Sequence, residues 1–388
     1  MLKYWIWLAT RKGLSARSIY LVASSFPSPK AAYDAPEAAY HEIEGLHSVR
    51  PLLDKDLSGA EAILRRCYEK NIQILTIGDK AYPSRLRTIS DAPVVLYYRG
   101  TLPDLNKPSV AVIGTREASV YGMSQAKKLA FGLAKCGCAV ISGGASGVDT
   151  EATRGALLGG GTAIVVLGGG VDVVYPRENK QLFQDVAKRG CLLSEYPPGT
   201  RPYRANFPQR NRIMSAMSLG VLITQAPARS GALITANHAL EQGRDVFVLP
   251  ANVDVDGFEG NMKLLREGAI PVATAWDIVS EYAPQYPHIL KMQEVSMPKE
   301  EPAAAPAEKK VIDKPKPKAY IDLKEKMNTL TEDEKLVAEL LQHGAMHIDD
   351  LVPKTGKAAN VILSVLTMLE IKGILRRPSA GIYELTEK

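Results

Sequence analysis

Cysteine and histidine are scarce in this sequence of 388 residues, which has four cysteines and six histidines. The cysteines show no spacing typical of metal ligands, and Cys136 and Cys138 are too close together for a relaxed disulfide. We therefore expect reduced thiols and no metal site.

Long apolar runs are also missing. The N-terminal YWIWLA is too short for a signal peptide and has no cleavage site, and AIVVLGGGVDVV is too short and too rich in glycine to span a bilayer. We therefore expect a cytoplasmic protein without a membrane partner. The excess of positive charge is small, with 48 Lys and Arg against 42 Asp and Glu, so an anionic partner is permitted but not required.

The signatures of nucleotide-dependent enzymes are absent as well. The sequence has no G-x-G-x-x-G followed by an acidic residue for a ribose, and no P-loop lysine. His238 lies on a predicted helix, where a packed or surface position is the simplest interpretation. Asp149 and Glu151 at a helix start are typical of capping. We therefore predict no catalytic residue, no cofactor and no enzymatic activity.

The residues that are present divide the chain into four parts. Residues 1–70 have helical periodicity and predict a small helical domain, similar to SAM or helix-hairpin-helix modules. Residues 71–282 contain near-continuous apolar runs such as VAVIG and DVFVLPA, separated by helical patterns, which predict a parallel α/β sheet covered on both faces. Residues 283–322 are rich in Pro, Ala, Lys and Glu and predict a flexible linker. Residues 323–388 show three helical patterns and an alternating segment, the order of a winged helix.

Several corners between strands and helices in residues 71–282 are rich in glycine or arginine. The corner in VISGGASGVDTEA would turn tightly and present backbone amides to an anion at a helix N-terminus. Its candidate residues are Gly143, Gly144, Ser146 and Gly147. Arg116 directly follows another predicted strand, and Arg229 and Ser230 precede another helix. The alternative is that the glycines serve packing alone. Because ligands bind at the carboxyl ends of parallel strands, we expect a phosphate-binding edge.

The segment RANFPQRNRIMS, residues 204–215, combines basic, amide and aromatic side chains. Its arginines can bind phosphates, and its amides can bond sugars or base edges. These residues are Arg204, Arg210, Arg212, Asn206 and Asn211. Phe207 offers a face on which an unpaired base can stack. The alternative is a structural arginine cluster with Phe207 in the core. Together with the glycine and arginine corners, the segment favours a single-stranded nucleic acid as the partner.

Residues 109–282 resemble the DNA-processing protein A family of bacteria, also written DprA or Smf. The resemblance rests on VAVIGTREASVYG, SGGASGVDTEATRGAL, LGGGVDVVYPRENKQL and the long segment from LLSEYPPG to DVFVLP. It implies an extended Rossmann-like fold, cooperative binding of single-stranded DNA, a homodimer, and help in loading the RecA recombinase during natural transformation. It also implies DNA contacts from the matching residues, which are Arg116, Arg204, Phe207, Arg210 and Arg212. The chain departs from many members at Ser146 and Thr153, which stand where arginine and histidine are common.

Two other functions compete with this interpretation. A phosphoribohydrolase of the lysine-decarboxylase-like group has a similar sheet domain and needs a P-G-G-x-G-T-x-x-E segment. The comparable residues 226–232 read APARSGA and are basic instead of acidic. A nucleotide-sensing winged-helix regulator is disfavoured because the sensor fingerprint is absent. The predicted third helix of the winged helix exposes Asn360, Ser364, Thr367 and Glu370, so we expect protein contacts or weak assistance to DNA binding from this domain.

Overall fold

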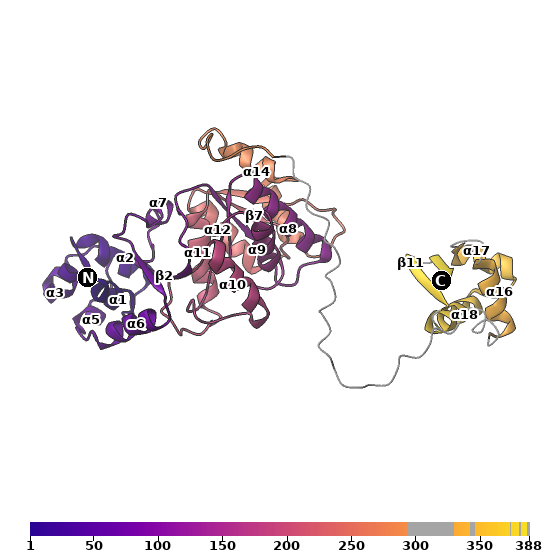
Figure 1. Ribbon diagram of the computed structural model, residues 1–388, viewed down its shortest axis with the longest axis horizontal. Coiled ribbons are helices and arrows are strands. Elements are labelled where there is room, and N and C mark those ends of the chain that lie inside the picture. The colour runs from indigo at the N-terminus through magenta and orange to yellow at the C-terminus, as the bar shows by residue number, and fades with distance from the viewer. Residues whose placement is uncertain (294–329, 342–345, 373, 380–381, 386–388) are drawn as a thin grey trace. The chain divides into compact units, whose positions relative to one another are not determined.

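The computed structural model describes residues 1–293, 330–341, 346–372, 374–379 and 382–385. These residues belong to two compact units, which span residues 1–299 and 300–388 (Figure 1). The first unit contains a helical part and a large sheet, and the second is a small helical domain with a sheet of its own.

A nine-stranded sheet organises the first unit. Its strands are β1 (Gln73–Thr76), β2 (Val95–Gly100), β3 (Ser109–Ile113), β4 (Ala139–Ser142), β5 (Ala163–Val166), β6 (Cys191–Ser194), β7 (Gly220–Ile223), β8 (Asp245–Val248) and β9 (Ile270–Pro271). The spatial order is β1-β2-β6-β5-β4-β3-β7-β8-β9. The run from β6 to β9 is parallel, whereas β1 and β2 form an antiparallel edge.

Helices cover both faces of this sheet because alternate residues of a strand point to opposite sides. In β3, Val110 and Val112 join a core with residues of α8 (Val120–Lys135), α9 (Val148–Leu158), α10 (Lys180–Arg189) and α14 (Ala275–Tyr282). Ala111 and Ile113 join a second core with residues of α7 (Ser84–Arg87), α11 (Asn206–Met217), α12 (Gly231–Glu241) and α13 (Glu259–Arg266). The predicted α/β class and the parallel sheet are confirmed. Two strands, β6 (CLLS) and β9 (IP), lie outside the apolar runs that predicted the sheet.

Six short helices precede the sheet and lie beside it (Figure 1). They are α1 (Leu2–Ala9), α2 (Ala16–Ser25), α3 (Pro29–Asp34), α4 (Glu37–His41), α5 (Arg50–Leu53) and α6 (Ser58–Glu69). Their buried residues, which include Trp7 and Tyr40, form a separate core. The Lys55 ammonium lies 5.0 Å from the centroid of the Tyr40 ring and 5.2 Å from those of Trp7 and Tyr33. Cation–π attraction and a hydrogen bond to the Tyr40 hydroxyl at 2.6 Å hold this lysine in the aromatic cluster.

The predicted linker, residues 283–322, begins with packed chain. Leu290 is buried in one core of the sheet, and Tyr286 packs against the same core. The amide of Lys291 donates a hydrogen bond to the Cys136 carbonyl at 3.1 Å. The prediction of a flexible linker is therefore corrected for residues 283–293, where apolar side chains find partners on the sheet domain. Residues 294–322 of that segment lie outside the described residues.

The second unit has the element order of a winged helix. Its helices are α16 (Glu332–Leu341), α17 (Ile348–Thr355) and α18 (Ala359–Ile371), and its strands are β10 (Met346–His347), β11 (Leu375–Ser379) and β12 (Ile382–Leu385). Val337, Leu351 and Leu366 are buried in its core, and β12 pairs with both β10 and β11. The predicted winged helix is confirmed. The exposed surface of α18 includes Asn360 and Thr367, and the sequence of α18 contains neither lysine nor arginine.

The buried carboxylate of Asp172 ties the N-terminal helices to the loop that precedes α11. Its Oδ2 atom accepts hydrogen bonds from Arg66 at 3.1 Å and Lys70 at 2.7 Å, both at the end of α6. Its Oδ1 atom accepts one from the Gly199 amide at 2.6 Å. Gly199 has a φ of +84°, and a side chain there would collide with the Arg66 guanidinium. Burial alone would raise the pKa of Asp172, but these hydrogen bonds outweigh burial and hold the pKa below its ordinary value.

Replacing Asp172 by asparagine should lower the free energy of unfolding at neutral pH by about 1–3 kcal/mol, because two cations and an amide lose a charged acceptor. Since the pKa is depressed in the folded state, this loss is fully present above the ordinary carboxyl pKa of about 4. The loss should shrink as the pH falls through the lower folded-state value, which urea unfolding at neutral and acidic pH will measure.

A matched control is Asp185→Asn, which removes an exposed ion pair with Lys188 and should change the stability little. If Asp172→Asn and its control were equally stable at neutral pH, Asp172 would not be what ties the N-terminal helices to the loop before α11.

Candidate nucleic-acid interface

The candidate site lies at the carboxyl ends of β3 and β7, where the order of the sheet reverses. From β3 the chain proceeds outward through β4, β5 and β6, and then returns to β7 on the other side of β3. The loops that follow β3 and β7 therefore diverge and leave a crevice between them. A pocket of about 410 Å³ occupies this place, and it is lined by the loops after β3, β4 and β7 and by α11.

Exposed cations stand around this pocket. Arg116, from the loop after β3, and Arg229, from the loop after β7, are exposed and line it. Arg204 is exposed as well, two residues before α11 begins. The carboxylate of Glu117 lies at the same rim. No carboxylate among the described residues forms an ion pair with any of the three arginines, so all three remain available to an anion.

Phe207, the second residue of α11, is half-buried beside the pocket. The Arg116 guanidinium lies 5.0 Å from the centroid of its ring, within the range of cation–π attraction. A side chain at Gly168 would come within 3.1 Å of the same ring. Asn206 fixes the start of α11 by donating a hydrogen bond to the Gly168 carbonyl at 2.9 Å. The ring is therefore held in place without being enclosed in either core of the sheet.

The guanidinium of Arg210 is buried beneath the pocket. Its Nη1 atom donates hydrogen bonds to the carbonyls of Gly143, at 2.7 Å, and of Val166, which lie at the ends of β4 and β5. Its Nε atom donates one to Asn211 at 3.2 Å. Burial lowers the pKa of Arg210 to about 10, so the group stays protonated at neutral pH. Arg210, which the sequence predicts to bind phosphate, thus forms a charged floor beneath the pocket and holds two strand ends together.

Arg212 points away from the pocket into a buried ion-pair cluster. Its Nε atom lies 3.2 Å from a carboxylate oxygen of Asp91, its Nη2 atom lies 2.5 Å from one of Glu195, and the residue is only 2% exposed. Residues two positions apart in a helix are about 200° apart around its axis, so Arg210 and Arg212 face different sides of α11. The prediction that Arg212 binds DNA is corrected, because the structural interpretation of this arginine holds.

Part of the glycine corner between β4 and α9 is bonded to other groups of the protein. The buried carboxylate of Asp149 accepts a hydrogen bond from the Ala145 amide at 3.3 Å, so one amide of this corner, outside the predicted set, already faces an anion. Burial raises the pKa of Asp149, although the nearby Arg210 charge acts in the opposite direction. The hydroxyl of Ser146 donates a hydrogen bond to Glu178 at 3.1 Å. The Ala145 amide and the Ser146 hydroxyl thus have partners within the protein, while the phosphate cradle at this corner stays a prediction.

The glycines of this corner make room for the arginines. A Cβ at Gly143 would lie 2.5 Å from the Arg210 guanidinium, and one at Gly147 would lie 2.5 Å from the Arg116 carbonyl oxygen. Gly144 and Gly147 have φ values of +68° and +74°, which side chains rarely adopt. These glycines therefore serve packing, and by leaving room for Arg210 and Arg116 they also shape the pocket.

The remaining polar candidates anchor the start of α12. Asn211 donates a hydrogen bond to the Gly231 carbonyl at 3.4 Å, and the Ser230 hydroxyl accepts one from the Ala232 amide at 3.2 Å. The Ser230 hydroxyl only accepts in this bond, so its hydrogen remains available for donation to a ligand, whereas Asn211 is 8% exposed and serves the fold. A residue outside the predicted set, Tyr175, lies beside Phe207 with its ring centroid 5.8 Å away. A tyrosine between valine and proline gives no surface signal in a sequence.

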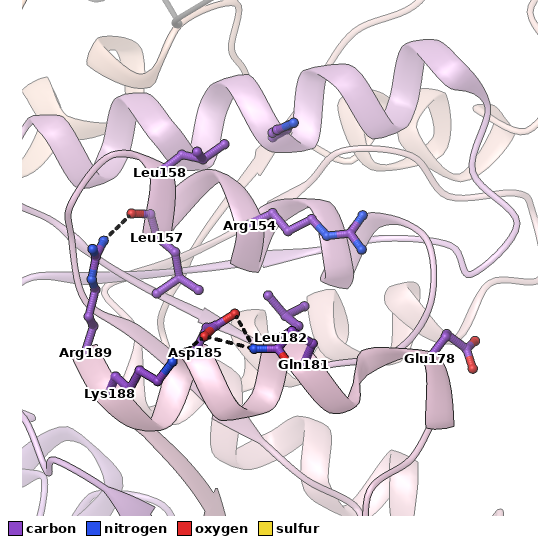
Figure 2. Close-up of a pocket in the computed structure, with 10 residues that line it drawn as sticks. Arg154, Leu157, Leu158, Glu178, Gln181, Leu182, Asp185, Lys188 and Arg189 are labelled. Carbon is purple, nitrogen blue, oxygen red and sulfur yellow. Dashed lines mark hydrogen bonds and ion pairs between the residues drawn. The ribbon is translucent and has the colours of Figure 1, made fainter. Parts of the chain in front are cut away.

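A larger hollow of about 550 Å³ lies elsewhere, among α8, α9 and α10 (Figure 2). Its cations already have partners: Lys188 lies 2.9 Å from Asp185, and Arg189 donates a hydrogen bond to the Leu157 carbonyl at 3.0 Å. Arg154, which lines the hollow, is paired with Glu151, which does not line it. Neutralised charges and leucine walls make this hollow a poorer match for a chain of phosphates than the smaller pocket is.

No described helix is long and apolar enough to cross a membrane. Within the same part of the chain, no cluster of three or more His, Cys, Asp or Glu side chains is placed to hold a metal ion.

Known proteins are similar to this chain in sequence and in fold. Residues 73–283 match the family described as DNA recombination-mediator protein A, and residues 322–381 match the DprA winged helix domain. Protein Smf of Synechocystis is 38% identical over 275 residues, which are 69% of each chain. DNA processing protein DprA of Streptococcus pneumoniae is 38% identical over 242 residues, or 62% of this chain and 85% of that protein.

Two solved structures agree with these matches. The X-ray structure of DNA processing protein A from Streptococcus pneumoniae superposes with a TM-score of 0.65 at 35% identity and covers 72% of this chain and 98% of that one. The structure of the Helicobacter pylori protein, which concerns its single-stranded DNA binding mode, has a TM-score of 0.50 at 32% identity and covers 55% and 97%. Because the family match spans the sheet and the winged helix, this chain belongs to the DprA/Smf family of DNA recombination-mediator proteins.

Proposed function

We propose that this chain is a non-enzymatic protein that binds single-stranded DNA at the pocket between β3 and β7. The observation that carries the proposal is the half-exposed ring of Phe207 beside the unpaired guanidinium of Arg116. A flexible strand offers both of the groups that such a site needs, phosphates for the cations and unpaired bases for the ring. A duplex hides its bases in the stack, so only its phosphates would be contacted.

The arrangement of charge supports a strand that lies across the rim. Arg116, Arg204 and Arg229 are exposed and come from three different loops, whereas the buried Arg210 adds positive charge from below. A ligand with several phosphates gains more from such spread cations than a mononucleotide does. Because hydrogen bonds fix Arg210 and the start of α11, which carries the Phe207 ring, before any ligand arrives, binding adds little ordering cost.

The relatives support the biological role in this proposal. The structure of the Helicobacter pylori relative concerns its mode of binding single-stranded DNA, and the matching family is named for mediating DNA recombination. We therefore propose that this chain protects incoming or exposed single strands and helps to load the RecA recombinase on them. A homodimer and a role in natural transformation belong to the same proposal, and both rest on the family.

The enzymatic alternative has less support from the site. The loop after β7, where a phosphoribohydrolase of the lysine-decarboxylase-like group needs a carboxylate, carries Arg229. The buried Asp149 is already engaged by the Ala145 amide and lies near Arg210, so it is poorly placed to act as a general base.

The wild-type protein should bind an oligothymidylate far more tightly than a mixed-sequence duplex of the same length. The logarithm of its affinity should fall with the logarithm of the salt concentration by about 0.7 for each phosphate neutralised. Fluorescence anisotropy over a series of salt concentrations measures both quantities. Equal affinity for the duplex would refute the proposed function.

Arg116→Ala should weaken binding to all single-stranded sequences alike, because a phosphate contact carries no sequence information. The salt slope should also fall by about 0.7, which corresponds to one phosphate contact. Arg154→Ala is the matched control, since this exposed arginine lines the larger hollow, where it is paired with Glu151, and should leave binding unchanged. Comparable losses in both variants would argue against a site at β3 and β7.

A further inference from the structure

Tyr175 has an exposed ring that the fold does not explain. The residue is 44% exposed, and its hydroxyl has no hydrogen-bond partner among the described residues. Two other tyrosines of this unit serve packing: Tyr82 and Tyr282 are buried, and their hydroxyls donate hydrogen bonds to the Pro93 carbonyl and to Asp245 at 2.8 and 2.5 Å. Single apolar side chains on an open surface are normal, whereas an exposed aromatic ring beside a binding pocket is placed to contact the ligand.

The backbone that carries Tyr175 is firmly anchored. The amide of Val173 donates a hydrogen bond to the Gly170 carbonyl at 2.8 Å. On the other side, the buried side chain of Asn179 donates hydrogen bonds to the Gly144 carbonyl at 3.1 Å and to the Thr150 hydroxyl at 2.7 Å. The exposed ring therefore projects from a turn that is fixed to the start of α9, so its position is set before a ligand arrives.

The ring of Tyr175 extends the surface that Phe207 begins. The two ring centroids are 5.8 Å apart, and the ring planes are inclined by 46°. Gly168 and Gly169 line the same small depression, where they add no side chain that could cover the rings. A base does not fit between two rings that already touch, so each ring can serve only a base of its own.

We propose that Tyr175 provides a second base-stacking position, next to that of Phe207, for a neighbouring unpaired base of the same strand. The proposal rests on the proposed function and deepens it, because the pocket then holds at least two bases and not one. Its ligand class is an unpaired nucleobase of any type, since every base has a face that can stack. The contact requires no charge, so it contributes affinity without adding to the salt dependence.

The test compares Tyr175→Ala, Tyr175→Phe and Phe207→Ala with the wild type in full-length protein. Each protein is titrated with an oligothymidylate and with an oligomer of equal length and charge in which every nucleotide is abasic. Tyr68→Ala is the matched control, because Tyr68 is a 91% exposed tyrosine on α6. Thermal unfolding of each variant verifies that the fold is retained.

Tyr175→Ala should bind the oligothymidylate about tenfold more weakly than the wild type, with an unchanged salt slope. Tyr175→Phe and Tyr68→Ala should bind like the wild type, and the loss in Tyr175→Ala should vanish on the abasic oligomer. Wild-type affinity of Tyr175→Ala for the oligothymidylate, or an equal loss on the abasic oligomer, would overturn the second stacking position. If Phe207→Ala still weakened binding in that case, the proposed function would stand. A wild-type protein that does not distinguish the two oligomers would refute base stacking at both rings.

Discussion

The buried guanidinium of Arg210 is the constraint on which the pocket depends. One side chain from α11 bonds the carbonyls at the ends of two neighbouring strands and lies 5.9 Å from the centroid of the Phe207 ring. A buried cation is costly unless its donors are satisfied and an opposite charge is near. The strand ends, the carboxylate of Asp149 and the start of α11 must therefore keep fixed relative positions. Gly143 has no side chain because the guanidinium occupies the space that a Cβ would need.

This constraint separates a rigid floor from an available rim. The polar groups of the floor are hydrogen-bonded to the protein itself. Arg210 bonds strand ends, Asn206 bonds the Gly168 carbonyl, and Asn211 bonds the start of α12. The rim keeps Arg116 and the ring of Phe207 accessible. Asp172 also restrains this region, since it fastens the loop before α11 to the N-terminal helices. Binding groups that are held in advance lose little conformational entropy when a strand arrives.

The sheet could be predicted because its central strands are buried on both faces and are therefore apolar throughout. Arg116 could be placed at the site because it follows such a strand directly, and the carboxyl ends of parallel strands meet at one edge. The different roles of Arg210 and Arg212 could not be predicted, since a helix with arginines on two sides does not reveal which side faces the core. Capping by Asp149 could be predicted from its place at a helix start, but the sequence does not show which amide of the corner the carboxylate engages, and that amide is Ala145. Tyr175 was missed because its partner, Phe207, lies 32 positions away in sequence and meets it only in the fold.

Photochemical cross-linking of an oligothymidylate to the full-length protein, followed by mass spectrometry of the adducts, tests the central claim most directly. The claim is that a single strand lies across the carboxyl ends of the sheet, with its bases on the exposed rings of this edge. Adducts on Phe207 and Tyr175, suppressed by unlabelled single strands but not by duplex, are the expected result. Adducts confined to the winged helix, or to the hollow among α8, α9 and α10, would contradict the account.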